Sequence, residues 1–351
     1  MKSVVVDKIA SVAQHNELAS ELRLSKDIPC EEGILVAARV LNNKSRYNQL
    51  ELTSGRMATV NQGDVIVGAL GHRKELRGYS GHLPTSLKPG AIIQILNIGG
   101  VLGICDSANP DVGPPFDCEV LGTVLSFPYL GERIGVPARA GLDSLGEDIV
   151  LDTKGVPVVA LAGTCMDSGK TAAACAIVGR LRHLGMHVAA CKATGVSLRR
   201  DVLAMEDAGA SETMIFSDFG IVTTTAANGP ELTRALLSGL AKHKPDVIVL
   251  ELGDGLLGAY GVGAILSDPA IREALTSVVL CANDPVSAWG GTELLRKEFK
   301  IEPALVTGPA TDNDVGIQQI NERCDLPAVN ALSNGVALGD MVADLLRKEG
   351  S

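Results

Sequence analysis

The second half of the chain alternates between short apolar runs and longer amphipathic segments. The apolar runs begin at Val158, Val188, Val247, Val278 and Ala304, and each ends in glycine or a polar residue. The segments with helical spacing cover residues 171–184, 200–210, 231–242, 292–299, 315–323 and 335–348. Strands that alternate with helices in this way form a mainly parallel sheet flanked by helices. We therefore predict an α/β domain over residues 150–351.

The first half has a different pattern. Apolar residues lie near helical spacing at Ile9, Val12, Leu18, Leu22 and Leu24, which predicts a helix within residues 1–25. Short β-branched runs interrupted by glycine-containing turns then fill residues 26–145 and predict a smaller β-rich domain, either a barrel or a sandwich. Residues 137–155 are rich in glycine, proline and aspartate, so we expect a linker there.

The composition narrows the classes of partner. With 351 residues, 46% hydrophobic and 21% charged, the chain can bury a substantial core in two domains. The formal charge of −10 and the aromatic content of 3% argue against a nucleic acid or an anionic membrane as partner. A local basic pocket for a phosphorylated ligand remains compatible with this charge.

Cysteine usage and hydropathy indicate the compartment. The eight cysteines show neither a Cys-x-x-Cys pair nor a cluster with histidine, so we expect reduced thiols and no zinc site. No apolar run approaches the roughly 20 residues of a membrane span. The N-terminal residues are too short and too interrupted for a secretion signal. We expect a cytoplasmic protein.

A glycine-rich segment joins the first strand of the second half to its first helix. It reads Gly163-Thr-Cys-Met-Asp-Ser-Gly-Lys-Thr171. In such a loop, backbone N–H groups bind phosphate oxygens, the lysine neutralises phosphate charge and the threonine hydroxyl binds Mg²⁺. Five residues separate its two glycines, whereas the standard pattern has four. The alternative is an ordinary strand-to-helix turn. The strand before and the helix after favour a nucleotide site formed by Gly163, Thr164, Asp167, Ser168, Gly169, Lys170 and Thr171.

Charged residues also follow the next two predicted strands. Lys192 closes the second strand, Asp201 follows it at the start of a helix, and Glu251 ends the apolar run of the third strand. The carboxyl ends of parallel strands meet at one edge of a sheet, so these groups should converge beside the phosphate loop. Carboxylates at this edge are the ligands that a nucleotide-bound Mg²⁺ requires.

The order of these motifs resembles that of dethiobiotin synthetase, and more broadly the P-loop branch that includes the cobyrinic acid amidating synthetases. The resemblance covers about residues 157–310. It implies that Thr171, Asp201 and Glu251 bind Mg²⁺ and that Lys170 and Lys192 are active-site lysines. It also implies a homodimer. The Lys192-Ala-Thr-Gly195 segment further resembles a P-loop family that includes a D-glutamate N-acetyltransferase-like protein.

The chain departs from dethiobiotin synthetase at several positions. Cys165 replaces an acidic residue of the loop, and Thr307-Gly308-Pro309 stands where the family has an Asn-Asp that helps to recognise adenine. Nothing matches the pocket for the biotin precursor, and residues 1–150 are foreign to that family. The resemblance therefore implies the nucleotide and metal chemistry but not the biotin substrate.

These patterns predict an ATP-dependent, Mg²⁺-requiring enzyme of the ligase or kinase type. It would transfer the γ-phosphoryl group to a small anionic substrate, a carboxylate or carbamate, or to a hydroxyl. The alternative is a nucleotide-driven switch that acts on a protein partner. Many such switches carry a second lysine early in the loop, where this chain has Thr164. The basic stretch at residues 71–82 is either a loop that reaches the substrate or a solvated hairpin.

Overall fold

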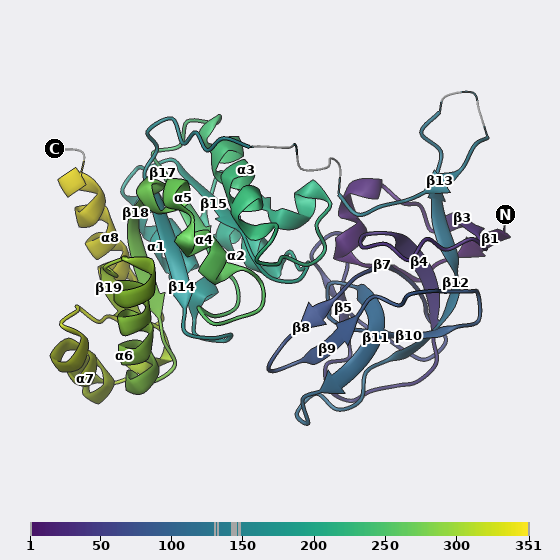
Figure 1. Cartoon of the computed structure of the whole chain (residues 1–351), viewed down its shortest axis with the longest axis horizontal. Helices are drawn as coiled ribbons and strands as arrows, with labels where there is room; N and C mark the ends of the chain where they lie inside the picture. Colours follow the sequence, from purple (N-terminus) through teal and green to yellow (C-terminus); the bar gives the residue numbers. More distant parts are fainter. Residues whose placement is uncertain (1, 130, 132, 142–145, 147–148, 350–351) are drawn as a thin grey trace. The chain divides into compact units, whose positions relative to one another are not determined.

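The computed structural model describes residues 2–129, 131, 133–141, 146 and 149–349, and it forms two compact units (Figure 1). The N-terminal unit comprises Met1–Ser144 together with two short later segments, Val196–Arg200 and Ser217–Thr223. The C-terminal unit comprises Leu145–Gly195, Asp201–Phe216 and Thr224–Ser351. The first boundary falls within the predicted linker, of which residues 142–145, 147 and 148 lie outside the described residues.

The C-terminal unit is built on a parallel sheet. Its strands are β14 (Val158–Gly163), β15 (Val188–Lys192), β16 (Glu212–Ile215), β17 (Val247–Glu251), β18 (Leu275–Cys281) and β19 (Leu305–Thr307), in the order β16-β15-β17-β14-β18-β19. The central strands β14, β15 and β17 are buried along their whole length, as expected for a sheet covered on both faces. The predicted α/β fold is confirmed. Strand β16 escaped prediction because this edge strand, Glu-Thr-Met-Ile, is short and only partly buried.

Helices cover this sheet (Figure 1). They are α1 (Lys170–His183), α2 (Arg200–Ala208), α3 (Gly229–Ala241), α4 (Val262–Ser267), α5 (Pro269–Ala274), α6 (Pro285–Leu294), α7 (Asp314–Cys324) and α8 (Gly335–Glu349). The helix predicted over residues 292–299 begins earlier, because Asp284 caps α6 by accepting the Ser287 N–H at 2.8 Å, and its end continues as a π-helical turn, Leu295–Phe299. In the described part of the chain, no helix is long and apolar enough to cross a membrane.

The N-terminal unit is a small β-barrel with additional strands. Its strands are β1 (Lys2–Val5), β2 (Lys8–Ile9), β3 (Glu21–Ser25), β4 (Leu35–Val40), β7 (Val65–Leu70), β8 (Arg73–Lys74), β9 (Tyr79–His82), β10 (Ile92–Ile95), β11 (Val101–Ala108), β12 (Asp117–Ser126) and β13 (Val136–Pro137), and β5 (Gln49–Glu51) and β6 (Met57–Thr59) form a separate hairpin. Strand β10 pairs with both β11 and β12, so the ring β12-β4-β7-β11-β10 closes on itself. The expected β-rich N-terminal region is therefore present, and of the two expected architectures it has the barrel.

The helix predicted within residues 1–25 is wrong. These residues form β1, β2, a short 3₁₀ helix (Ser11–Asn16) and β3. In β3, Leu22 and Leu24 are buried while Glu21 and Arg23 are exposed, which is the two-residue period of a strand. The apolar positions between Ile9 and Leu24 belong to β2, the 3₁₀ helix, β3 and the chain between them, and together they gave one apparent helical period.

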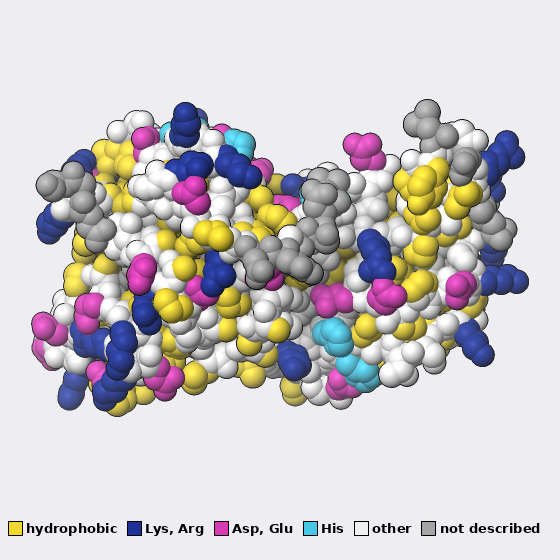
Figure 2. All heavy atoms as spheres, turned by 45° about the horizontal axis from the view of Figure 1, so that its top comes forward, with side chains coloured by type: hydrophobic (Ala, Val, Ile, Leu, Met, Phe, Trp, Pro, Cys, Tyr) yellow, Lys and Arg dark blue, Asp and Glu magenta, His cyan; other side chains and the backbone are white. Residues whose placement is uncertain are grey.

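The surface carries charges of both signs. On the face drawn in Figure 2, basic and acidic side chains are interspersed, with apolar atoms between them. This agrees with a sequence that has 31 basic and 41 acidic residues.

Candidate nucleotide-binding site

The glycine-rich loop folds around the ammonium group of Lys170. Gly163 ends β14, Gly169 adopts a left-handed conformation (φ 86°), and Lys170 begins α1. Lys170 is 6% exposed, and its Nζ donates to the Cys165 carbonyl oxygen at 2.9 Å and to Ser168 Oγ at 3.4 Å. A Cβ atom on Gly163 would lie 2.5 Å from Ser168 Oγ and 2.6 Å from Lys170 Nζ. A side chain at 163 would therefore displace the Ser168 hydroxyl and the Lys170 side chain from their places in the loop.

The remaining loop residues fix its path out of the sheet. The Thr164 N–H donates to the Cys281 carbonyl at 2.9 Å, which ties the loop to β18. Asp167 adopts a left-handed backbone conformation (φ 54°) at the turn. Asn283, which follows β18, donates from Nδ2 to Cys165 Sγ at 2.9 Å. This last contact had no sequence signal beyond the position of Asn283 at a strand end.

At two further glycines, the segments that follow other strands approach the loop closely. An added Cβ on Gly255 would lie 2.7 Å from both the Cys165 Cα and the Thr164 carbonyl oxygen. On Gly308, it would lie 2.3 Å from the Ser168 carbonyl oxygen. The segments after β17 and β19 thus form close walls of the loop. Glycine at or shortly after the end of an apolar strand was the available signal, because it permits such close backbone approach.

Glu251 lies beside the start of α1. Its Oε1 accepts the Thr171 hydroxyl at 3.2 Å, and its Oε2 is buried without a hydrogen-bond partner among the described residues. In the sheet register Glu251 is paired with Lys192 on β15. Burial raises the pKa of Glu251, and the neighbouring Asp201 carboxylate raises it further, while Lys192 and Lys170 oppose the rise.

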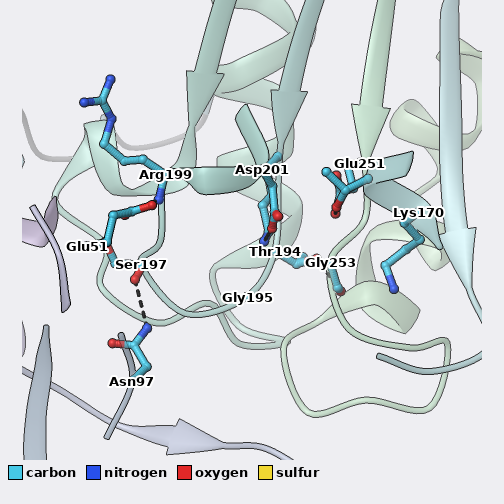
Figure 3. A network of polar contacts seen from close by, with 12 residues as sticks. Glu51, Asn97, Lys170, Thr194, Gly195, Ser197, Arg199, Asp201, Glu251 and Gly253 are labelled. Carbon is cyan, nitrogen blue, oxygen red and sulfur yellow. Dashed lines mark hydrogen bonds and ion pairs between the residues drawn. The ribbon is translucent and has the colours of Figure 1, made fainter. Parts of the chain in front are cut away.

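Lys192 and Asp201 form a buried ion pair. Each residue is 8% exposed, and Lys192 Nζ donates to Asp201 Oδ2. An added Cβ on Gly253 would lie 2.2 Å from the Thr194 carbonyl oxygen and 3.0 Å from Lys192 Cε, so glycine lets the backbone pass close to Thr194 beside the lysine side chain. Figure 3 shows Asp201, Glu251 and Lys170 in one close-up at the carboxyl ends of the strands. The structure thus brings together the five charged or hydroxyl groups predicted from three strand ends: Lys170, Thr171, Lys192, Asp201 and Glu251.

The oxygen ligands fit a magnesium ion that is shared with a nucleotide. Thr171, Asp201 and Glu251 offer a hydroxyl and two carboxylates, and Glu251 Oε2 is a buried oxygen that a cation or its water would satisfy. No group of three or more His, Cys, Asp or Glu side chains able to hold a metal occurs among the described residues. Mg²⁺ is typically held by one or two carboxylates together with phosphate oxygens and water, so two acids are sufficient.

Comparisons with known proteins give distant structural likenesses only. No protein-family model matches the chain, and no curated protein matches it in sequence. A DUF1611 family protein from Anabaena variabilis is 14% identical with a TM-score of 0.41, over 62% of this chain and 65% of that one. Chloroplast FtsY from Physcomitrella patens is 15% identical with a TM-score of 0.38, over 58% and 68%. The hydrogenase maturation factor HypB from Archaeoglobus fulgidus is 13% identical with a TM-score of 0.38, over 55% and 91%.

The class of the C-terminal unit follows from its own geometry. A parallel sheet, a glycine-rich loop between β14 and α1, and Lys170-Thr171 at the start of that helix are the features of a P-loop NTPase fold.

Proposed function

We propose that the C-terminal unit binds Mg²⁺ and ATP and transfers the γ-phosphoryl group to a small carboxylate, carbamate or hydroxyl. The observation that carries the proposal is the convergence of two ammonium groups, one hydroxyl and two carboxylates around the phosphate loop. Phosphoryl transfer depends mainly on positioning and on neutralising charge, so this set of groups is sufficient without a strong base.

Each group has a role in this proposal. Lys170 binds the β- and γ-phosphates from inside the loop, and Lys192 neutralises the group in transfer once it turns from Asp201. Thr171, Asp201 and Glu251 hold Mg²⁺, which neutralises charge on the phosphate oxygens. The acceptor oxygen bonds to the γ-phosphorus while the bond from phosphorus to the bridging oxygen breaks, and ADP leaves. A carboxylate or carbamate acceptor has no proton to lose, and a hydroxyl acceptor releases its proton to water as its oxygen bonds to phosphorus.

The resemblance to dethiobiotin synthetase extends the proposal. It favours a ligase outcome, in which a nucleophile captures the phosphorylated acid. It also favours a homodimer, because sites of that family lie near a subunit interface. The biotin precursor itself is not proposed as the substrate, because the residues of its pocket have no counterpart in this chain.

A nucleotide-driven switch is the second candidate. The observation that favours it is that Val196–Arg200 and Ser217–Thr223, both from the P-loop half of the sequence, belong to the N-terminal unit. A change at the nucleotide could be transmitted to that unit through these segments, and a protein partner would respond to it.

The first experiment replaces the loop lysine. We expect Lys170→Ala to lower kcat/KM for ATP turnover by roughly 100-fold or more, because one charged donor to the phosphates is lost. The matched control is Lys297→Ala, which removes an exposed lysine of the same unit that pairs with Glu293. Circular dichroism checks that both variants fold. Wild-type turnover in folded Lys170→Ala would reject the site.

The second experiment separates the two candidates. ADP release is measured with the wild-type protein across a panel of small carboxylates, carbamates and alcohols. Release that depends on one small molecule supports the transfer enzyme. ADP release that no compound of the panel changes, but that a purified protein partner increases, supports the switch.

A further inference from the structure

Two pieces of the P-loop half are built into the N-terminal unit. Segment 196–200 (Val196–Arg200) lies in the sequence between Lys192 and Asp201, and segment 217–223 (Ser217–Thr223) follows β16. The two pair with each other, because the Ser197 N–H donates to the Val222 carbonyl at 2.8 Å. The residues that connect two predicted site residues therefore fold with the barrel unit.

Buried polar residues of the barrel unit hold segment 196–200 (Figure 3). Glu51 is fully buried, and its Oε2 accepts the Arg199 N–H at 2.8 Å. Asn97, 3% exposed, donates from Nδ2 to the Ser197 carbonyl at 2.9 Å. Arg199 also donates from Nη1 to the Thr53 carbonyl at 2.9 Å. Both backbone and side chain of this segment are thus fixed by the N-terminal unit.

Segment 217–223 is held in the same manner. Glu32 accepts the Thr223 N–H at 2.7 Å and the Val222 N–H at 3.2 Å. His15 Nε2 lies 2.9 Å from Asp218 Oδ1. Because this segment pairs with segment 196–200, its anchors support the same short piece of chain.

The chain runs directly from the anchored segment into the metal-binding carboxylate. Arg199 is the residue before α2, and Asp201 lies in the first turn of that helix. The Arg199 N–H that Glu51 accepts is therefore two residues from Asp201. A carboxylate at this place also interacts favourably with the positive end of the helix dipole. The hydrogen bond to the Arg199 N–H holds the chain where α2 begins. It therefore orients the Asp201 side chain, which projects from the first turn of that helix.

We propose that Glu51 is a positioning residue for the Mg²⁺–nucleotide site. By holding Arg199, it fixes the first turn of α2 and the Asp201 carboxylate, and segment 196–200 couples the barrel unit to nucleotide binding. The inference rests on the proposed function, since it needs a metal site that includes Asp201. By thermodynamic linkage, binding of Mg²⁺ and nucleotide stabilises the anchored segment in return.

The test compares Glu51→Ala with Glu51→Gln, which keeps an acceptor oxygen. Loss of a residue that orients a metal ligand lowers metal affinity by about 10- to 100-fold. We therefore expect Glu51→Ala to raise the Mg²⁺ concentration for half-maximal ATP turnover at least about 10-fold. ATP binding without Mg²⁺, measured in EDTA, should not change, because it depends on the phosphate loop. Glu51→Gln should restore most of the Mg²⁺ affinity.

The matched control is Asp7→Ala. Asp7 Oδ2 accepts the Val65 N–H at 2.8 Å, so this change removes the same kind of hydrogen bond elsewhere in the barrel unit. It should leave the Mg²⁺ requirement unchanged. An equal shift in both alanine variants would overturn the proposal, because general loosening of the barrel would explain it. So would a folded Glu51→Ala protein with the wild-type Mg²⁺ requirement.

Hydrogen exchange of the wild-type protein gives a measurement that does not depend on a variant folding. Mg²⁺ and ATP should slow exchange at amides 197–203 and at 49–53, in addition to the loop amides 163–171. Protection confined to the loop would overturn the coupling while leaving the nucleotide site intact. Absence of any ATP binding by the wild type would overturn the proposed function as well.

Discussion

Burial of the Glu251 carboxylate at the candidate nucleotide-binding site lowers the stability of the folded protein. It is 2% exposed, and burial together with the Asp201 charge raises its pKa above the ordinary value. The cost of burying its charged form is offset only in part by Lys192 and Lys170. A buried acid of this kind is typical of a site that receives a cation.

The pKa of Glu251 leads to a stability prediction for Glu251→Gln without nucleotide. Because the folded pKa is raised above the unfolded value, the wild type loses stability as pH rises from the unfolded pKa towards the folded one. The variant lacks this loss, so its melting temperature should exceed that of the wild type by a margin that grows over this pH range. Each 1 kcal/mol corresponds to roughly 2–4 °C for a domain of this size.

Thermal melts at a series of pH values measure this margin. Mg²⁺ and ATP should reverse the order, because only the wild type retains the carboxylate ligand for the metal. A margin between the two melting temperatures that stays constant with pH would show that the folded pKa of Glu251 is not raised.

Arg73 shows that a run of basic residues in the sequence does not reveal which of them are buried. The basic stretch at residues 71–82 had two interpretations, a substrate loop or a solvated hairpin. The structure forms the hairpin β8–β9, but Arg73 is buried, paired with Glu75 and donating to Tyr47 Oη at 2.8 Å. Burial of an arginine depends on partners distant in sequence, so residue type alone could not reveal it.

At the scale of the element, the loop between β14 and α1 depends on glycine for space. We expect Gly163→Ala to weaken ATP binding strongly, because its Cβ would lie 2.5 Å from Ser168 Oγ and 2.6 Å from Lys170 Nζ. The control is Gly290→Ala in α6, where an added Cβ meets no atom within 4 Å. Alanine there should stabilise the helix by about 0.5–1 kcal/mol.

Isothermal titration with ATP and Mg²⁺ compares the two glycine variants. Equal affinities would mean that the loop accommodates the extra methyl group by shifting.

The sequence predicted helices and strands correctly where the period of the hydrophobic residues agreed with the residues that mark the ends of an element. The helices over residues 171–184 and 335–348 match α1 and α8, and the five apolar runs match β14, β15, β17, β18 and β19. Prediction failed where elements were short. The apparent period between Ile9 and Leu24 joined β2, the 3₁₀ helix and β3 into one helix. The elements β16, α4 and α5 are too brief to show a period of their own.

At the scale of the molecule, two short segments from the second half of the sequence belong to the N-terminal unit. Glu51 and Glu32 hold backbone N–H groups of segments 196–200 and 217–223, which lie far along the sequence. A fragment that ends at residue 150 would leave the buried Glu51 carboxylate and the half-buried Glu32 carboxylate without these donors. Unpaired buried acceptors cost about 1–3 kcal/mol each.

We therefore expect the fragment 1–150 to be less stable than the same residues in the full chain. Hydrogen exchange of peptides from β4 and β7 measures this, since both strands belong to the barrel ring. Equal protection in the fragment and the full chain would show that the barrel does not require the two segments.

The sequence by itself determined the α/β class, the phosphate loop and the five candidate groups around it, because these depend on local spacing and on the rule that parallel strand ends share an edge. Tertiary structure alone decided the closed ring of the barrel, the Lys192–Asp201 ion pair and the anchoring of segment 196–200 by Glu51. The physical reason is that these features arise from pairing between groups distant in sequence. Local periodicity reports which face of an element is buried, but not which partner buries it.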